Sequence, residues 1–174
     1  MGCTVYTVGH STHPIDEFVQ LLRAHGVRGI ADVRTIAKSR HNPQFNEDAL
    51  TASLPESGID YRRLEILGGL RHTTKDSING AWRNASFRGY ADYMQTDAFA
   101  TGVQELRAIA AERPTAIMCA EAVPWRCHRS MIGDALLVRG DEVIDIMGQT
   151  SAKPHTLTSF AKVSGTRVSY PPQD

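Results

Sequence analysis

The chain has 174 residues, of which 41% are hydrophobic and 22% are charged, and its formal net charge at pH 7 is zero. This length and composition are typical of one globular domain, and the zero net charge argues against a protein that coats nucleic acid by bulk electrostatics. Because no window reaches the roughly 18 to 20 apolar residues of a membrane span and the N-terminus lacks a secretory signal, we expect a cytoplasmic protein without a membrane partner.

Strands and helices alternate in the first part of the chain. Residues 3–8 are rich in β-branched and aromatic side chains and stop at Gly9, which predicts a buried strand. Pro14 at a helix start, acidic residues in the first turn and Gly26 as a stop signal predict a helix between them. Three further elements follow: a strand over 27–33, a helix over 46–57 and an edge strand over 59–64.

The next part of the chain begins with a long polar segment. Residues 67–88 contain Gly-Gly and clustered Thr and Asn without an apolar period, so they predict a loop. The pattern then predicts a short helix over 89–95, a helix from Asp97 to Pro114, a buried strand over 115–119, a helix over 128–138 and a strand over 142–147. We expect residues 148–174 to form a peripheral, weakly structured C-terminal segment with one strand near 167–170.

This alternation predicts the fold class and the place of a site. It is typical of a single α/β domain, residues 1–174, with a mostly parallel central sheet flanked by helices in a Rossmann-like three-layer arrangement. Ligands of such sheets bind beyond the carboxyl ends of the strands. Three predicted strands end there in polar or reactive residues: His10 and Ser11, Asp32 and Arg34, and Cys119 and Glu121. We therefore expect a shared polar pocket at this edge.

The segment 119–129 contains the densest reactive chemistry. Cys127 is predicted at a helix start between Arg126 and His128, where the helix dipole and neighbouring positive charge favour a thiolate. Cys119 has no basic neighbour in sequence and is expected to be a buried core thiol. Three cysteines cannot all pair, which favours a reducing compartment. Their spacing is a poor metal signature, so we predict no metal ligands.

Anion binding is the other chemistry that these residues suggest. The free N–H groups at the start of the 128–138 helix, together with Arg34 and Arg129, predict a cradle for phosphate or carboxylate. Glu121, His10 and His128 are candidate acids and bases. The alternative is that Asp32 and Glu121 simply hold the arginines in salt bridges. Neither a Walker motif nor a dinucleotide fingerprint is present, which argues against an NAD or P-loop enzyme and leaves the identity of any cofactor open.

Positive charge gathers in two connecting segments. Residues 35–46 contain two cations and no acid, and residues 62–88 contain six Lys or Arg against two acids. Either these segments are solvated surface, or Arg40 and Arg71 contribute to anion binding.

Several motifs in order resemble the family called domain of unknown function 488. They are Thr7-Val-Gly-His-Ser11, Asp32-Val-Arg34, Ser39-Arg40, Asn42-Pro43, Phe45-Asn46, Gly58-Ile59, Tyr61, Leu67-Gly-Gly69, Tyr90-Ala91, Tyr93-Met94, Met118-Cys119, Glu121 and Cys127-His-Arg129. The chain departs at Ala37, where the family commonly has proline. The resemblance implies an intracellular α/β fold and marks these polar positions, but it implies no established reaction.

Three functions remain open on this sequence. The leading hypothesis is an enzyme acting on a phosphate-bearing or other anionic substrate, such as a nucleotide or a nucleic-acid end. The alternative is a non-catalytic module that binds a nucleotide or nucleic acid, and the third is redox or covalent chemistry at Cys127. The candidate catalytic residues are His10, Glu121, Cys127 and His128, and the candidate substrate-binding residues are Ser11, Asp32, Arg34, Arg40, Arg71 and Arg129. The oligomeric state is not predicted.

Overall fold

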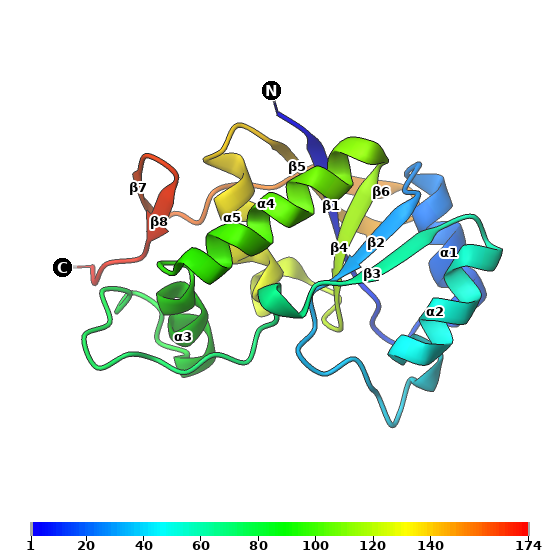
Figure 1. Ribbon diagram of the computed structural model, residues 1–174, viewed down its shortest axis with the longest axis horizontal. Helices are drawn as coiled ribbons and strands as arrows, with labels where there is room; N and C mark the ends of the chain where they lie inside the picture. Colours follow the sequence, from blue (N-terminus) through cyan, green and yellow to red (C-terminus); the bar gives the residue numbers. More distant parts are fainter. Residues whose placement is uncertain (1, 174) are drawn as a thin grey trace.

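A six-stranded sheet runs through the middle of the protein in the computed structural model, which describes residues 2–173 (Figure 1). The strand order is β3-β2-β4-β1-β5-β6. The strands are β1 (Thr4–Gly9), β2 (Gly29–Asp32), β3 (Asp60–Arg63), β4 (Thr115–Cys119), β5 (Glu142–Gly148) and β6 (Ser151–Pro154). All neighbours are parallel except β5 and β6. The predicted mostly parallel α/β sheet is therefore confirmed.

Helices cover both faces of this sheet. The α-helices are α1 (Ile15–Ala24), α2 (Glu47–Glu56), α3 (Ala85–Tyr93), α4 (Asp97–Glu112) and α5 (Arg129–Leu137), and the short 3-10 helices are η1 (Pro43–Phe45), η2 (Glu65–Leu67) and η3 (Pro124–Arg126). The first two α-helices share one hydrophobic cluster with the sheet, and α3, α4 and α5 share the other. The three-layer arrangement predicted from sequence is present.

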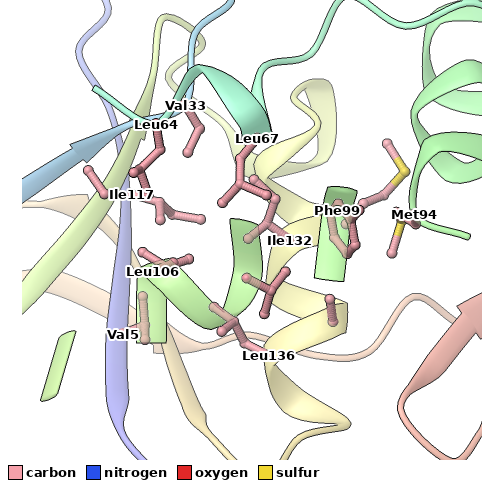
Figure 2. Packing of buried hydrophobic residues seen from close by; sticks show 14 of the residues in the cluster. Val5, Val33, Leu64, Leu67, Met94, Phe99, Leu106, Ile117, Ile132 and Leu136 are labelled. Atoms are coloured by element: carbon pink, nitrogen blue, oxygen red, sulfur yellow. The ribbon is translucent and has the colours of Figure 1, made fainter. Parts of the chain in front are cut away.

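The two cores follow from the alternation of side chains along each strand. Val8 and Ile30 face the cluster under α1 and α2, whereas Ala31 and Ile117 face the cluster under α4 and α5. Figure 2 shows this second cluster, in which Leu106 and Ile117 lie close together in a fully buried position. These apolar layers hold the strand ends in place.

The topology brings three strand ends together. Because β4 lies between β2 and β1, the carboxyl ends of these strands are adjacent. Gly9 is level with Cys119 in the parallel register. The hydrogen bonds continue past the strands, with His10 N donating to the Cys119 carbonyl (2.9 Å) and Val33 N donating to the Met118 carbonyl (3.1 Å). The expected meeting of the three ends is thus confirmed.

The C-terminal segment is more ordered than predicted. Beyond β6, strands β7 (Lys162–Ser164) and β8 (Arg167–Ser169) form a hairpin, and Tyr170 is fully buried. The expected strand near 167–170 is present as β8, and the strands at 151–154 and 162–164 were not expected, whereas residues 155–161 contain no helix or strand. The residues of β6 and β7 are exposed, so no hydrophobic alternation marked them in the sequence.

The loop expected over 67–88 ends earlier than predicted. Helix α3 starts at Ala85 because the Asn84 side chain accepts hydrogen bonds from Ser86 N (2.8 Å) and Phe87 N (3.2 Å). Among the described residues, no helix has both the length and the apolar character needed to cross a membrane.

Candidate functional site

A cavity of about 370 Å³ opens at the carboxyl edge of the sheet. We call it the thiol cavity, because both Cys119 and Cys127 line it. Its other lining residues come from the segments after β2, η2 and β4 and from the start of α3: Arg34, Thr35, Ile36, Gly69, Leu70, Ser86, Phe87, Ala120, Glu121, Arg126 and His128. Ile36 and Leu70 are large apolar side chains, each 64% exposed, so the cavity has apolar residues among its polar ones.

Arg129 lies against the Cys119 sulfur. The first turn of α5 carries this arginine back under the loop after β4, where its side chain is completely buried. Its Nη1 donates to Cys119 Sγ at 2.9 Å and to the Glu121 carbonyl at 2.5 Å, and its Nη2 donates to the Ala122 carbonyl at 3.2 Å. Arg129 therefore fixes the exit of β4 and places a positive charge on its thiol.

No carboxylate within residues 2–173 lies at ion-pair distance from Arg129. The Asp145 carboxylate interacts with the Arg129 charge electrostatically, without direct contact. A buried guanidinium is costly unless an anion compensates it. Carbonyl oxygens offer partial negative charge only and Asp145 acts from a longer distance, so an ionised Cys119 would be the counter-charge in direct contact with Arg129. The geometry by itself thus favours a thiolate at Cys119.

The two thiols of the cavity differ in acidity. Burial raises the pKa of Cys119, but a hydrogen bond from Cys127 and the Arg129 guanidinium outweigh it and lower the pKa to about 7. Burial and the neighbouring Cys119 raise the pKa of Cys127 well above its ordinary value. The thiolate is therefore expected at Cys119, with Cys127 as the protonated partner, the reverse of the assignment that the sequence suggested.

His128 offers Cys127 a hydrogen-bond acceptor. Its Nε2 lies 2.8 Å from the Val33 carbonyl, which can only accept, so Nε2 carries the proton. The unprotonated Nδ1 then faces Cys127 Sγ at 3.6 Å. Burial lowers the pKa of His128 to about 4, which keeps the ring neutral near pH 7. His128 Nδ1 is therefore an acceptor within reach of the Cys127 proton.

A second cavity, of about 340 Å³, adjoins the first. We call it the polar cavity, and its lining is His10, Ser11, Thr12, Arg34, Ile36, Lys38, Ser39, Asn42, Ala120, Glu121 and Ala122. Arg34, Ile36 and Glu121 line both cavities. Six residues of the predicted site therefore line these two neighbouring cavities: His10, Ser11, Arg34, Glu121, Cys127 and His128.

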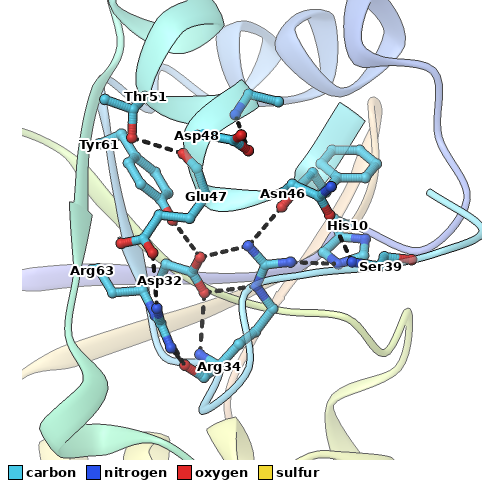
Figure 3. A network of polar contacts seen from close by, with 12 residues as sticks. His10, Asp32, Arg34, Ser39, Asn46, Glu47, Asp48, Thr51, Tyr61 and Arg63 are labelled. Atoms are coloured by element: carbon cyan, nitrogen blue, oxygen red, sulfur yellow. Dashed lines mark hydrogen bonds and ion pairs between the residues drawn. The ribbon is translucent and has the colours of Figure 1, made fainter. Parts of the chain in front are cut away.

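Arg34 is held by the protein itself. Its Nε and Nη2 donate to the two carboxylate oxygens of Asp32 at 2.9 and 2.6 Å, and Nη2 also donates to the Phe45 carbonyl at 2.7 Å (Figure 3). Tyr61 donates its hydroxyl to the same carboxylate at 2.6 Å. Arg63 donates to the Arg34 carbonyl at 3.0 Å. Asp32 and Arg34 therefore form the salt bridge that was the alternative to a catalytic role, and they shape the loop after β2.

His10 is also fully engaged. Its Nδ1 lies 2.8 Å from the Ser11 carbonyl, so this nitrogen carries the proton, and its Nε2 accepts from Arg34 Nη1 at 3.4 Å. The ring stacks on Phe45 with 4.3 Å between ring centroids. Burial, despite the Ser11 hydrogen bond, lowers the pKa of His10. In this arrangement the ring positions the loop and leaves Glu121 as the acid or base that lines both cavities.

Close backbone packing explains the glycine before His10. A Cβ at Gly9 would overlap the Glu121 carbonyl oxygen and would lie 2.7 Å from Arg129 Nη1. Ser11 follows in a left-handed backbone conformation, with φ 49°, and its N–H donates to the Ala120 carbonyl at 2.9 Å. Such a conformation is unfavourable for a residue other than glycine and is found at functional sites. Because Gly9 has no Cβ, the end of β1 can lie directly against the Glu121 carbonyl and Arg129.

The other predicted residues lie apart from the cavities. Arg40 is exposed and does not line them. Arg71 lies 3.7 Å above the Tyr93 ring and donates to the Gly68 carbonyl at 3.1 Å, which anchors the loop after η2. The N–H groups at the start of α5, which were expected to bind an anion, donate to the protein itself. Arg129 N donates to Cys127 Sγ, and Ser130 N donates to the Cys127 carbonyl. Within residues 2–173 no three His, Cys, Asp or Glu side chains form a metal-binding group.

Sequence reasoning missed the role of Cys119. Its cation is ten positions away, at Arg129, and only the turn between β4 and α5 brings the two together. A buried strand ending in Cys and followed by an Arg in the first turn of the next helix is the signal that was available.

The fold and the site define an α/β protein with a paired thiol site at the carboxyl edge of its sheet. A model of one protein family, described as Domain of unknown function DUF488, matches residues 14–136, which is most of the chain. The chain belongs to this family, as its motifs indicated. The matched range contains Cys119, Cys127 and Arg129 and omits His10 and Ser11. Searches of curated proteins and of solved structures found no match.

Proposed function

We propose that this protein is an enzyme that uses the Cys119 thiolate against a small anionic substrate, such as a phosphate ester of a nucleotide or of a nucleic-acid end. The observation that carries the proposal is the 2.9 Å contact between Arg129 Nη1 and Cys119 Sγ at the wall of a cavity. A thiolate is the nucleophilic form of cysteine, and a neighbouring cation stabilises it.

The cavity lining supports the anionic substrate class. Arg126 is exposed and lines the thiol cavity, and Lys38 lines the polar cavity beside it. Both are available to a phosphate or carboxylate, whereas Arg34 and Arg129 are buried and make several hydrogen bonds inside the protein. In the proposed reaction the Cys119 sulfur attacks the phosphorus, so that an S–P bond forms and the bond from phosphorus to the leaving-group oxygen breaks, while the protonated Glu121 carboxyl gives its proton to that oxygen. Water then attacks the phosphorus, gives a proton to Glu121 and breaks the S–P bond, which releases phosphate and restores the thiolate.

Alkylation at Cys119 tests both parts of the proposal. We expect iodoacetamide to label Cys119 faster than it labels a free thiol peptide, with half of the maximal rate near pH 7. We also expect the anionic reagent iodoacetate to be favoured relative to its reaction with the peptide, because Arg126 attracts it. Arg126→Ala should remove this preference, while Arg83→Ala, an exposed arginine outside the cavity lining, should keep it.

Turnover is tested with chromogenic phosphate esters and nucleotides. Cys119→Ser should abolish activity, and Glu121→Gln should slow esters with poor leaving groups most. A Cys119 that is labelled no faster than the free peptide would refute the thiolate. The three cysteines are free, and we propose the reducing cytoplasm as the compartment in which this thiolate persists.

A non-catalytic module for nucleotides or nucleic acid is the second candidate. The polar cavity favours it, since Lys38, Ser39 and Asn42 meet there beside the exposed Arg40. It predicts salt-sensitive binding that Arg40→Ala and Lys38→Ala weaken and that Cys119→Ser leaves unchanged. The response to Cys119→Ser thus separates the two candidates.

A further inference from the structure

Two thiols with different acidities line the same cavity. Cys119 and Cys127 both contact Arg129, whose Nη1 donates to Cys119 Sγ and whose backbone N donates to Cys127 Sγ. Both thiols are free, and they are 3% and 6% exposed. Because both sulfurs lie on the wall of one cavity and against one arginine, a small local movement is enough to bring them to bonding distance. The segment that joins them, 120–126, is a loop with only the single turn of η3, so that movement does not require a strand or an α-helix to break.

We propose that Cys119 and Cys127 form a dithiol pair in which a peroxide oxidises Cys119 and Cys127 then captures it as an intramolecular disulfide. This inference rests on the proposed thiolate at Cys119 and adds a partner and a redox activity to it. The oxidant is a small peroxide, for which the thiol cavity of about 370 Å³ leaves ample room.

The chemistry balances in two steps. First, the Cys119 thiolate attacks the peroxide; an S–O bond forms, the O–O bond breaks, and the departing oxygen leaves as water or an alcohol after taking a proton from solvent. Second, the Cys127 sulfur attacks the Cys119 sulfenic acid; an S–S bond forms, the S–O bond breaks, and the Cys127 proton leaves with the hydroxide as water. The two thiols lose two electrons and the peroxide gains them.

The surrounding residues suit each step. Arg129 Nη1, at 2.9 Å from Cys119 Sγ, stabilises the attacking thiolate. His128 Nδ1, at 3.6 Å from Cys127 Sγ, is the acceptor for the second thiol's proton, and the Val33 carbonyl fixes the tautomer that allows it. Arg129 N–H also donates to Cys127 Sγ at 3.4 Å. Cys3 lies outside this arrangement, with its Sγ against the Arg107 carbonyl.

The test uses the full chain carrying Cys3→Ser, so that only the two cavity thiols remain. After treatment with hydrogen peroxide, we expect the protein to lose two hydrogens by intact mass, to give a Cys119–Cys127 linked peptide, and to form no adduct with dimedone. With Cys127→Ser added, dimedone should instead label Cys119. With Cys119→Ser added, the same exposure should leave Cys127 reduced.

Each outcome decides one of the two proposals. If Cys119 reacts rapidly with iodoacetamide but its sulfenic acid persists while Cys127 is present, the dithiol inference is wrong and the proposed thiolate enzyme stands. If Cys119 reacts with neither reagent, the proposed function itself fails. The linked peptide is measured in the Cys3→Ser protein alone, so a folding defect in either of the other variants does not decide the result.

Discussion

At the scale of single residues, Arg129 has the largest role in the site. It holds the turn after β4 by donating to two carbonyl oxygens, and it stabilises a negative charge at the cavity wall by donating to the Cys119 sulfur. Arginine suits this position because its planar group presents several donors in fixed directions, which the single ammonium of lysine does not reproduce. Structure and reactivity at Cys119 therefore depend on the same side chain.

Arg129→Lys should raise the pKa of Cys119 toward the value of an ordinary thiol, compared with the same background that keeps Arg129. The reason is that a lysine cannot reach the sulfur and both carbonyls together. The pH dependence of the thiolate ultraviolet absorbance, in a protein with Cys3 and Cys127 replaced by serine, measures the change. Arg126→Lys is the control, since that arginine is exposed. An unchanged midpoint in Arg129→Lys would show that the guanidinium does not set the acidity.

Gly9→Ala should destabilise the protein by about 1–3 kcal/mol, because the added methyl group overpacks the contact with the Glu121 carbonyl and Arg129. Gly148→Ala is a matched control, since the nearest atom to its Cβ, in Ser151, is 3.9 Å away. Urea unfolding of both variants provides the comparison. Equal stability in the two variants would contradict the close approach described for β1.

At the scale of elements, a buried ionic link joins α5 to β5 and to the C-terminal segment. His155 lies 3.0 Å from a carboxylate oxygen of Asp134 in α5 and 3.0 Å from one of Asp145 in β5. Since both ring nitrogens face carboxylates, the ring donates twice and is charged. Burial opposes this charge, but the two carboxylates outweigh it and raise the pKa of His155 to about 9.

This raised pKa predicts how stability depends on pH. The stabilisation from His155 is complete below about pH 6.5, the value of the free side chain, and is lost as pH rises through about 9. The lowered pKa of Cys119 acts in the opposite sense between pH 7 and 9. The measurement therefore needs a background in which Cys119 and Cys127 are both serine.

In that background we expect the melting temperature, followed by circular dichroism, to fall between pH 6.5 and 9. Adding His155→Asn should lower stability at pH 6.5, by about 3–5 kcal/mol if the carboxylates stay buried and unpaired, and should flatten the pH dependence. If the melting temperature of His155→Asn falls by the same amount between pH 6.5 and 9, the pH dependence comes from another group.

At the scale of the whole molecule, the C-terminal segment anchors the long loop that borders the thiol cavity. Tyr170 N donates to Asn79 Oδ1 at 2.8 Å, and the Ala81 N–H donates to the Tyr170 carbonyl at 3.0 Å. The Tyr170 hydroxyl donates to Asp134 Oδ2 at 2.7 Å. These contacts, at Asn79 and Ala81, tie the later part of the segment 72–84 to the rest of the protein (Figure 1).

Tyr170→Ala should release this loop to proteases. Losing a buried aromatic side chain costs about 3–5 kcal/mol. The loop also loses a ring that packs edge-on against Trp82, with 5.4 Å between the ring centroids. We expect trypsin to cut at Lys75 or Arg83 much faster in the variant, with mass spectrometry of the fragments as the measurement. Val163→Ala in the exposed hairpin serves as the control. Uniform cleavage across the chain would indicate global unfolding instead of local release.

The same scale shows what the sequence could and could not predict. The parallel sheet, its buried strands and the meeting of their ends were predictable, because apolar periods and Gly or Pro stop signals are local in sequence. The C-terminal strands carry no such signal, since β6 pairs through exposed residues. The acidity of Cys119 and the hydrogen bonds of Arg34 depend on which side chains meet after folding. The order of strand, Cys119 and the Arg129 at the next helix start made a contact between the two possible, but it did not determine the direction in which the Arg129 side chain turns.

The burial of Arg129 beside a sulfur limits how the protein can change over time. A serine at position 119 would leave a buried cation without its anion, and an apolar residue at 129 would leave two carbonyls and a thiol without their donor. Substitution at either position therefore costs more than substitution at both, so the two should be kept or lost as a unit when related chains diverge.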